Sequence, residues 1–118
     1  MEEYAEHLFC GCGTASGVWS LVSQWCGIPP IYAFTVRDLL DLYKSVSLSS
    51  VKKEVLHGVI IIACWRKWKA RNEMIFASKK MNVVKIFVEV KALGFLWFFN
   101  RYKKKCIDWK DWCSFNFV

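Results

Sequence analysis

Residues 51–104 constrain the fold most strongly, because they read as two long helices separated by one short polar break, "SKKMN". Neither half shows the alternation of apolar and polar residues that strands joined by hairpin turns require. Residues 83–104 are apolar around most of a helix, so we expect them to be central, with Asn82 as the N-cap. The first helix, residues 51–76, carries its apolar side chains within one broad stripe at helical spacing: Val51, Val55, Ile62, Trp65, Trp68 and Ile75.

Gly58 weakens the first long helix by about 1 kcal/mol without ending it. The β-branched run "VLHGVIII" leaves a strand as the alternative there. Thr14 and Thr35 are placed to cap two shorter helices before the long pair, and Asp108 one helical turn after it. The sequence therefore predicts a single all-α domain over residues 1–118, a small bundle of about four helices with short connections. We expect residues 1–13 to form an irregular segment before the helices of residues 14–118.

The charge of the chain is concentrated in its second half. Residues 1–50 hold two bases and five acids, a net charge of −3, whereas residues 51–118 hold fifteen bases and five acids, a net charge of +10. A half this basic is suited to RNA or DNA, and the alternative is a solvated basic face. The candidate nucleic-acid contacts lie in "WRKWKARN" and "RYKKK": Arg66, Lys67, Lys69, Arg71, Arg101, Lys103, Lys104 and Lys105.

Each of these two basic segments also has a purely structural interpretation. In the first, Trp65 and Trp68 near the cations can stack on bases. The interpretation that we favour there is that both tryptophans pack inward while the cations are solvated. In the second, cations at a helix C-terminus are stabilised by the helix dipole without any ligand.

The opening stretch "EEYAEHLFCGC" contains candidate metal ligands. His7 and Cys12 have a spacing suited to half of a tetrahedral zinc site, and Cys10 is a further candidate ligand. The alternative is an ordinary N-terminus with a surface histidine and unpaired thiols. The six cysteines include no C-x-x-C, and no apolar signal peptide precedes them, so we expect an intracellular, reducing location, nuclear or cytoplasmic.

The sequence lacks the motifs of independent catalysis and of membrane insertion. It has no G-x-S-x-G, no glycine-rich phosphate loop and no H-E-x-x-H, so we expect no enzymatic activity. "GVIIIACW" is apolar for only eight residues, and the longer run "VVKIFVEVKALGFLWFF" carries three charged residues. A spanning helix needs about 20 apolar residues. We therefore expect no membrane span.

Four segments together resemble a known family: "EHLFCGC", "ASGVWSLVSQWCGI", "CWRKWKARNEMIF" and "VKALGFLWFFNRYKKKCIDWKDWC". In this order they resemble the reverse-transcriptase zinc-binding domain of plant non-LTR (LINE-type) retrotransposons, over almost the whole chain. In that family the domain follows the polymerase in a long polyprotein. The positions that match the family pattern after the metal segment are Ala15, Trp19, Trp68, Arg71, Asn72 and Phe76.

The resemblance makes His7 the family histidine and Cys12 the last of the family cysteines. The two upstream cysteines of the pattern are absent, and Met1 begins where they would end. The resemblance thus implies a truncated reverse-transcriptase tail without polymerase motifs, associated with nucleic acid, whose incomplete site holds zinc weakly or not at all. The alternatives are a non-functional remnant or a helical interaction module that self-associates through exposed aromatic side chains: Trp97, Phe98, Phe99, Trp109 and Trp112.

Overall fold

The described part of the chain is mostly helical and contains no strand, which confirms the all-α prediction. The structure is a computed structural model that describes residues 13–33, 35–77, 82–103 and 107–116. Its elements are α2 (Gly13–Cys26), α3 (Val36–Asp41), the 3₁₀ turn η2 (Leu42–Lys44), α4 (Ser50–Ala77), α5 (Val83–Arg101) and α6 (Trp109–Cys113). The described residues contain no strand, so the strand alternative for "VLHGVIII" is wrong.

Local side chains determine where most of these helices begin. Thr35 and Asp38 form a capping box: the Thr35 hydroxyl accepts from the Asp38 amide at 3.0 Å, and the Asp38 carboxylate accepts from the Thr35 amide at 3.1 Å. Asn82 and Asp108 each accept from the amide three residues on, at 3.0 and 2.8 Å. The predicted N-caps Thr35, Asn82 and Asp108 are therefore confirmed. The prediction that Thr14 is an N-cap is wrong, because α2 already includes Gly13 and Thr14 lies within the helix. Helix α2 ends before Gly27, whose φ of 67° lies in the left-handed region.

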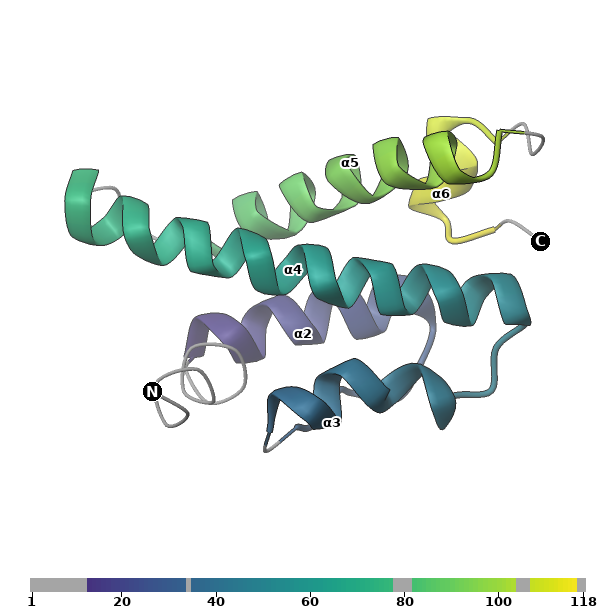
Figure 1. The fold of residues 1–118 in the computed structure, drawn as a ribbon, viewed down its shortest axis with the longest axis horizontal. Coiled ribbons are helices and arrows are strands. Elements are labelled where there is room, and N and C mark those ends of the chain that lie inside the picture. The colour runs from purple at the N-terminus through teal and green to yellow at the C-terminus, as the bar shows by residue number, and fades with distance from the viewer. Residues whose placement is uncertain (1–12, 34, 78–81, 104–106, 117–118) are drawn as a thin grey trace.

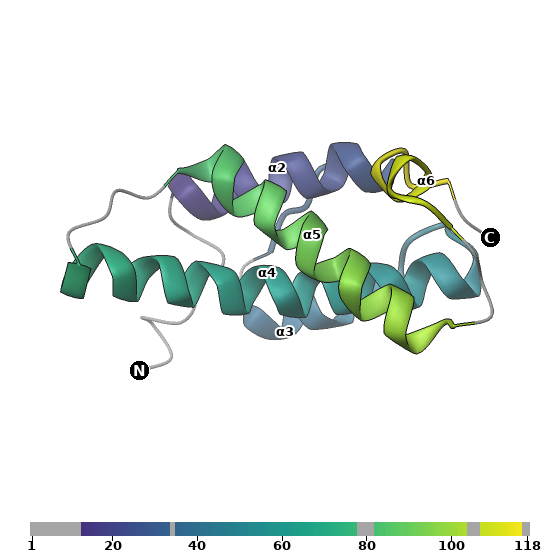
Figure 2. The same cartoon turned by 90° about the horizontal axis from the view of Figure 1, so that it is seen from above.

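The long helices α4 and α5 are antiparallel neighbours, as their short connection predicts. Figure 1 shows α4 between α5 on one side and α2 and α3 on the other. Seen from above, α5 runs obliquely from the beginning of α2 to the first turns of α4 (Figure 2). Val83 meets Gly17 at one end of this path, and Arg101 pairs with Glu54 at the other.

The expectation that the second long helix is central is wrong, because α4 has neighbours on more sides than α5. Helix α4 contacts α2, α3, η2 and α5, whereas α5 buries one stripe and leaves the opposite side open. The buried stripe consists of Ile86, Val90, Gly94 and Phe98, and the open side carries Val84, Val88 and Leu96.

An aromatic cluster around Trp112 joins α5, α6 and the end of α2. The Trp112 ring is fully buried, its indole N–H donates to the Lys91 carbonyl at 2.9 Å, and Trp25 donates to the Trp112 carbonyl at 3.0 Å. Its ring centroid lies 5.5 Å from that of Phe98, which is also fully buried. Two of the five aromatics proposed for self-association, Phe98 and Trp112, are therefore core residues.

Glycines let two tryptophan rings lie against helix backbones. A Cβ built on Gly94 would lie 2.9 Å from the Trp112 ring, and one on Gly58 would lie 2.8 Å from the Trp97 ring. Both distances are shorter than ordinary carbon contacts of about 3.5–4.0 Å. Gly58 thus has a packing reason for its place inside α4.

Helix α4 is rotated about its axis relative to the predicted stripe. Five successive residues, 59–63, are all apolar, so hydrophobic periodicity does not single out one face there. Trp65, Trp68 and Ile75, three members of the predicted stripe, are instead exposed. The observed buried face consists of Val55, Leu56, Val59, Ile60, Ala63, Arg66, Lys67 and Ala70.

Candidate nucleic-acid interface

Two of the predicted nucleic-acid contacts lie inside the protein. Arg66 is 6% exposed and Lys67 is fully buried, although both sit between two tryptophans that we expected to pack inward. The Arg66 Nε donates to a carboxylate oxygen of Glu89 on α5, and its Nη1 lies 3.6 Å from a carboxylate oxygen of Glu73 on α4. Arg66 on α4 therefore forms a polar contact between the two long helices.

The electrostatics of Glu89 are consistent with this structural role of Arg66. The hydrogen bond from Arg66 holds the pKa of the Glu89 carboxyl below its ordinary value of 4.5, and burial opposes this shift. The charges of Arg66, Lys85 and Lys69 lower the pKa of Glu89 further. Glu89 is thus ionised at neutral pH, surrounded by cations from both helices.

The prediction that Trp65 and Trp68 pack inward is wrong. The two side chains are 49% and 50% exposed, and the Lys69 ammonium lies 5.3 Å from the centroid of the Trp65 ring. At 100° per residue, six exposed side chains lie within about 120° of the helix circumference. We call this surface the outer face of α4, and it consists of Ile61, Trp65, Trp68, Lys69, Ile75 and Phe76.

The other candidate cations do not join this face. Arg71 is half-buried, whereas Arg101 and Lys103 lie exposed at the end of α5. The Arg101 guanidinium donates to a carboxylate oxygen of Glu54 in the first turns of α4. Glu54 and Lys69 are fifteen residues apart on α4, about 22 Å along its axis. Lys104 and Lys105 lie outside the described residues.

Glu54, like Glu89, accepts a hydrogen bond from an arginine of the other long helix. The nearby Tyr102 hydroxyl first, and then Arg101, hold the pKa of the Glu54 carboxyl below its ordinary value against the effect of burial. This polar cluster connects the end of α5 to the beginning of α4. Arg101 therefore has a structural partner in addition to its place in the basic segment.

The proposed metal ligands His7, Cys10 and Cys12 also lie outside the described residues. Within the part of the chain that the structure describes, no group of three or more His, Cys, Asp and Glu side chains is placed to hold a metal ion. The second histidine, His57, instead faces the α3 segment, where its Nδ1 lies 3.0 Å from the Leu40 carbonyl oxygen.

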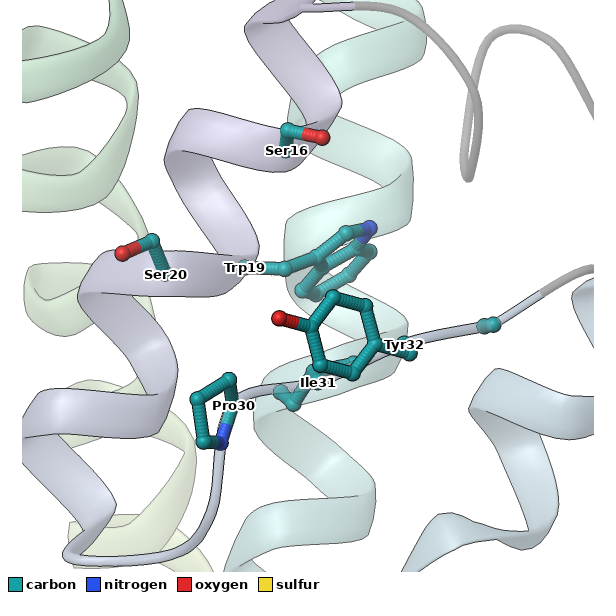
Figure 3. Close-up of a pocket in the computed structure, with 7 residues that line it drawn as sticks. Ser16, Trp19, Ser20, Pro30, Ile31 and Tyr32 are labelled. Carbon is teal, nitrogen blue, oxygen red and sulfur yellow. The ribbon is translucent and has the colours of Figure 1, made fainter.

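A hollow of about 410 Å³ lies between α2 and the connection to α3 (Figure 3). It is lined by Ser16, Trp19, Ser20, Tyr32 and their neighbours, with Trp19 buried beneath it and Tyr32 at 84% exposure. Its lining has hydroxyl groups and rings but no acid, base or thiol. The serine and tyrosine hydroxyls therefore have no neighbouring acid, base or thiol among the lining residues to activate them.

Comparison of the chain with models of known protein families, with curated proteins and with solved structures finds no match. Among the described helices, none is both long enough and apolar enough to cross a membrane. The outer face of α4 corresponds to the alternative in which Trp65 and Trp68 are available beside the cations, and not to the favoured inward packing. Helix α4 is rotated about its axis relative to the prediction, so a different side of it is exposed. The local sequence does not specify this rotation.

Proposed function

We propose that the chain is a nucleic-acid-binding module without catalytic activity of its own, of the kind that follows the polymerase in reverse transcriptases of plant non-LTR retrotransposons. The ordered resemblance of four segments and the net charge of +10 over residues 51–118 support the proposal. The observation that carries it is the outer face of α4, where Lys69 lies against the exposed ring of Trp65, with Trp68 beside them.

Phosphate attraction supplies most of the affinity in this proposal. Cations on an exposed surface release counterions from nucleic acid, so binding weakens as salt rises. Lys69, Lys85 and Lys103 are exposed, whereas Arg66 is occupied by two carboxylates. We therefore assign the phosphate contacts to the exposed lysines and remove Arg66 and Lys67 from the candidate set.

The test is a fluorescence-anisotropy titration of labelled RNA. Between 50 and 200 mM salt we expect the affinity to fall by more than about tenfold. Lys69→Gln should reduce the slope of log affinity against log salt by about 0.7 for a single strand. Arg37→Gln is the matched control, because it removes the same charge from an exposed position beside Asp41 in the acidic half. Undetectable binding at low salt, or binding insensitive to salt, would contradict the proposal.

The zinc segment is a separate part of the proposal. His7 and Cys12 are the two ligands that the resemblance assigns, with Cys10 as a third candidate, and a structural zinc site takes four. We expect well under one zinc per chain by elemental analysis after dialysis. A stoichiometric zinc that survives dialysis would show that other side chains complete the site.

A helical interaction module is the second candidate function, favoured by the open side of α5. Val84, Val88, Leu96 and Phe99 are all exposed there, and Trp109 of α6 is 44% exposed. Apolar patches of this kind promote association. Light scattering of the purified protein tests this candidate, and a monomer over a wide concentration range would count against it.

A further inference from the structure

The outer face of α4 exposes two large aromatic side chains in a helix that buries two cations. Trp65 and Trp68 are each half-exposed, whereas Arg66 and Lys67 between them are buried. Tryptophan is highly buried on average, and lysine and arginine are almost never fully buried. This arrangement leaves about half of each indole side chain at the surface, with the Lys69 ammonium over the Trp65 ring.

The spacing of Trp65 and Trp68 along α4 is of the same order as the spacing of neighbouring bases in a strand. Residues three apart on a helix have Cβ atoms about 5–6 Å from each other, and they rise about 4.5 Å along its axis. Neighbouring bases of a strand are spaced at about 3.4 Å when stacked. Trp65 and Trp68 are thus placed to contact bases that are close together in one strand, and the Lys69 ammonium is beside Trp65 to meet the phosphate between them.

The charges around the face favour a polyanion. Residues 66–85 contain seven bases and one acid. That acid, Glu73, and Glu89 from α5 both lie against the buried Arg66, which offsets one of their two negative charges. Lys69 and the exposed Lys85 remain at the surface. A strand with negative phosphates and apolar base faces complements this combination of cations and rings.

We propose that Trp65 and Trp68 form a stacking platform for unpaired bases, so that the chain binds single-stranded nucleic acid in preference to duplex. This inference rests on the proposed function. In a duplex the faces of the bases are stacked on one another and out of reach of a side chain on a helix surface. A duplex also carries the denser phosphate charge, so a surface that acts through charge alone binds duplex at least as tightly.

The experiment compares two fluorescein-labelled probes, an unstructured RNA strand of about 20 nucleotides, longer than common single-strand site sizes, and its blunt duplex. The full chain is titrated against both at the same salt concentration. We expect the single strand to bind at least about tenfold more tightly. Trp65→Leu and Trp68→Leu should each weaken single-strand binding by about fivefold or more while leaving the salt slope unchanged.

Two variants control for other effects of substitution. Trp65→Phe keeps an aromatic ring and should retain most of the affinity. Tyr32→Leu removes an aromatic side chain of 84% exposure from the connection between α2 and α3, and it should change nothing. The strand preference is measured on the unmodified chain, so it tests the platform even if a variant folds poorly.

The outcomes separate this inference from the function on which it rests. Equal or tighter binding of duplex, or tryptophan variants that bind like the unmodified chain, would overturn the platform and leave salt-dependent binding in place. The absence of binding to both probes at low salt would overturn the inference and the proposed function together. If the tryptophan variants abolish self-association and leave RNA affinity unchanged, the face is a protein-docking surface and the platform is wrong.

Discussion

Replacing Arg66 by methionine tests whether a basic residue in the segment "WRKWKARN" acts inside the fold. Methionine keeps the unbranched apolar stem, but it removes the guanidinium that contacts Glu73 of α4 and Glu89 of α5. We expect the protein to lose stability, because the hydrogen bond that joins the two long helices disappears. Nucleic-acid affinity should hardly change, because the Arg66 side chain is not at the surface.

The size of the effect follows from the exposure of the three side chains. A hydrogen bond to a charged partner contributes about 1.5–3 kcal/mol. The Glu73 and Glu89 side chains are 26% and 35% exposed, so water recovers part of the loss once Arg66 is gone. We therefore expect a loss of about 1–2 kcal/mol, which lowers Tm by roughly 3–10 °C for a chain of this size.

The assay is thermal and urea unfolding followed by circular dichroism, with Lys69→Met as the matched control. Lys69 carries the same charge in the same segment but is exposed, so its replacement should change stability by no more than about 0.5 kcal/mol. It should weaken RNA binding instead. Two results would refute the assignment of Arg66 to the interior. One is an equal loss of stability in both variants. The other is an Arg66→Met variant of unchanged stability that weakens RNA binding as Lys69→Met does.

Three further perturbations test other parts of the structure. Gly94→Ala should lower the free energy of unfolding, measured with urea, by a net of about 1–2 kcal/mol. A Cβ at this position would lie 2.9 Å from the fully buried Trp112 ring, and the cost of this overpacking exceeds the gain in helix propensity from alanine. The pKa of Glu89 is lower in the folded chain than in the unfolded chain, so the folded chain binds fewer protons. The contribution of Glu89 to stability is therefore complete above about pH 5 and is lost as the pH falls below 4.5. Arg66→Met should flatten this acid dependence of the urea midpoint. Burial raises the pKa of the Cys26 thiol to about 12. Mass spectrometry should therefore find Cys26 unmodified by iodoacetamide at pH 8 in the folded chain and modified after denaturation. Rapid modification of the folded chain would contradict its buried position.

Helix order and most helix starts are predictable because they depend on neighbours in sequence, although Thr14 lies inside α2 and does not cap it. Thr35 and Asp38 form their capping box across three residues, and Asn82 and Asp108 cap in the same local way. The break between the two long helices follows from one polar segment. These features need no knowledge of the tertiary structure.

The rotation of α4 was not predictable, because it depends on contacts between helices. Residues 59–63 are apolar on every side, so several faces of the helix are equally suited to burial. The partner that allows Arg66 to be buried is Glu89, which lies twenty-three residues later on α5. A local rule places such a cation in water and its neighbouring tryptophans inside, which is the reverse of the structure.

The structure changes which residues are available for the proposed interface. The excess of cations in residues 51–118 predicts nucleic-acid binding, and Lys69 is at the surface, where the proposed contact needs it. Spacing predicts that Trp65 and Trp68 lie in the core, whereas in the structure both are exposed and Lys69 lies over the Trp65 ring. Arg101, with Glu54 as its partner, lies about 22 Å along α4 from Lys69.

The most direct test of the interface is to follow the seven tryptophan indole N–H signals of a ¹⁵N-labelled chain by NMR during titration with a single-stranded RNA. Single-tryptophan substitutions assign the signals. We predict that the signals of Trp65 and Trp68 shift first and furthest, while those of the buried Trp19 and Trp112 stay in place. Shifts confined to Trp109, or no shift at a salt concentration where the strand is bound, would contradict the claim that the outer face of α4 holds the nucleic acid.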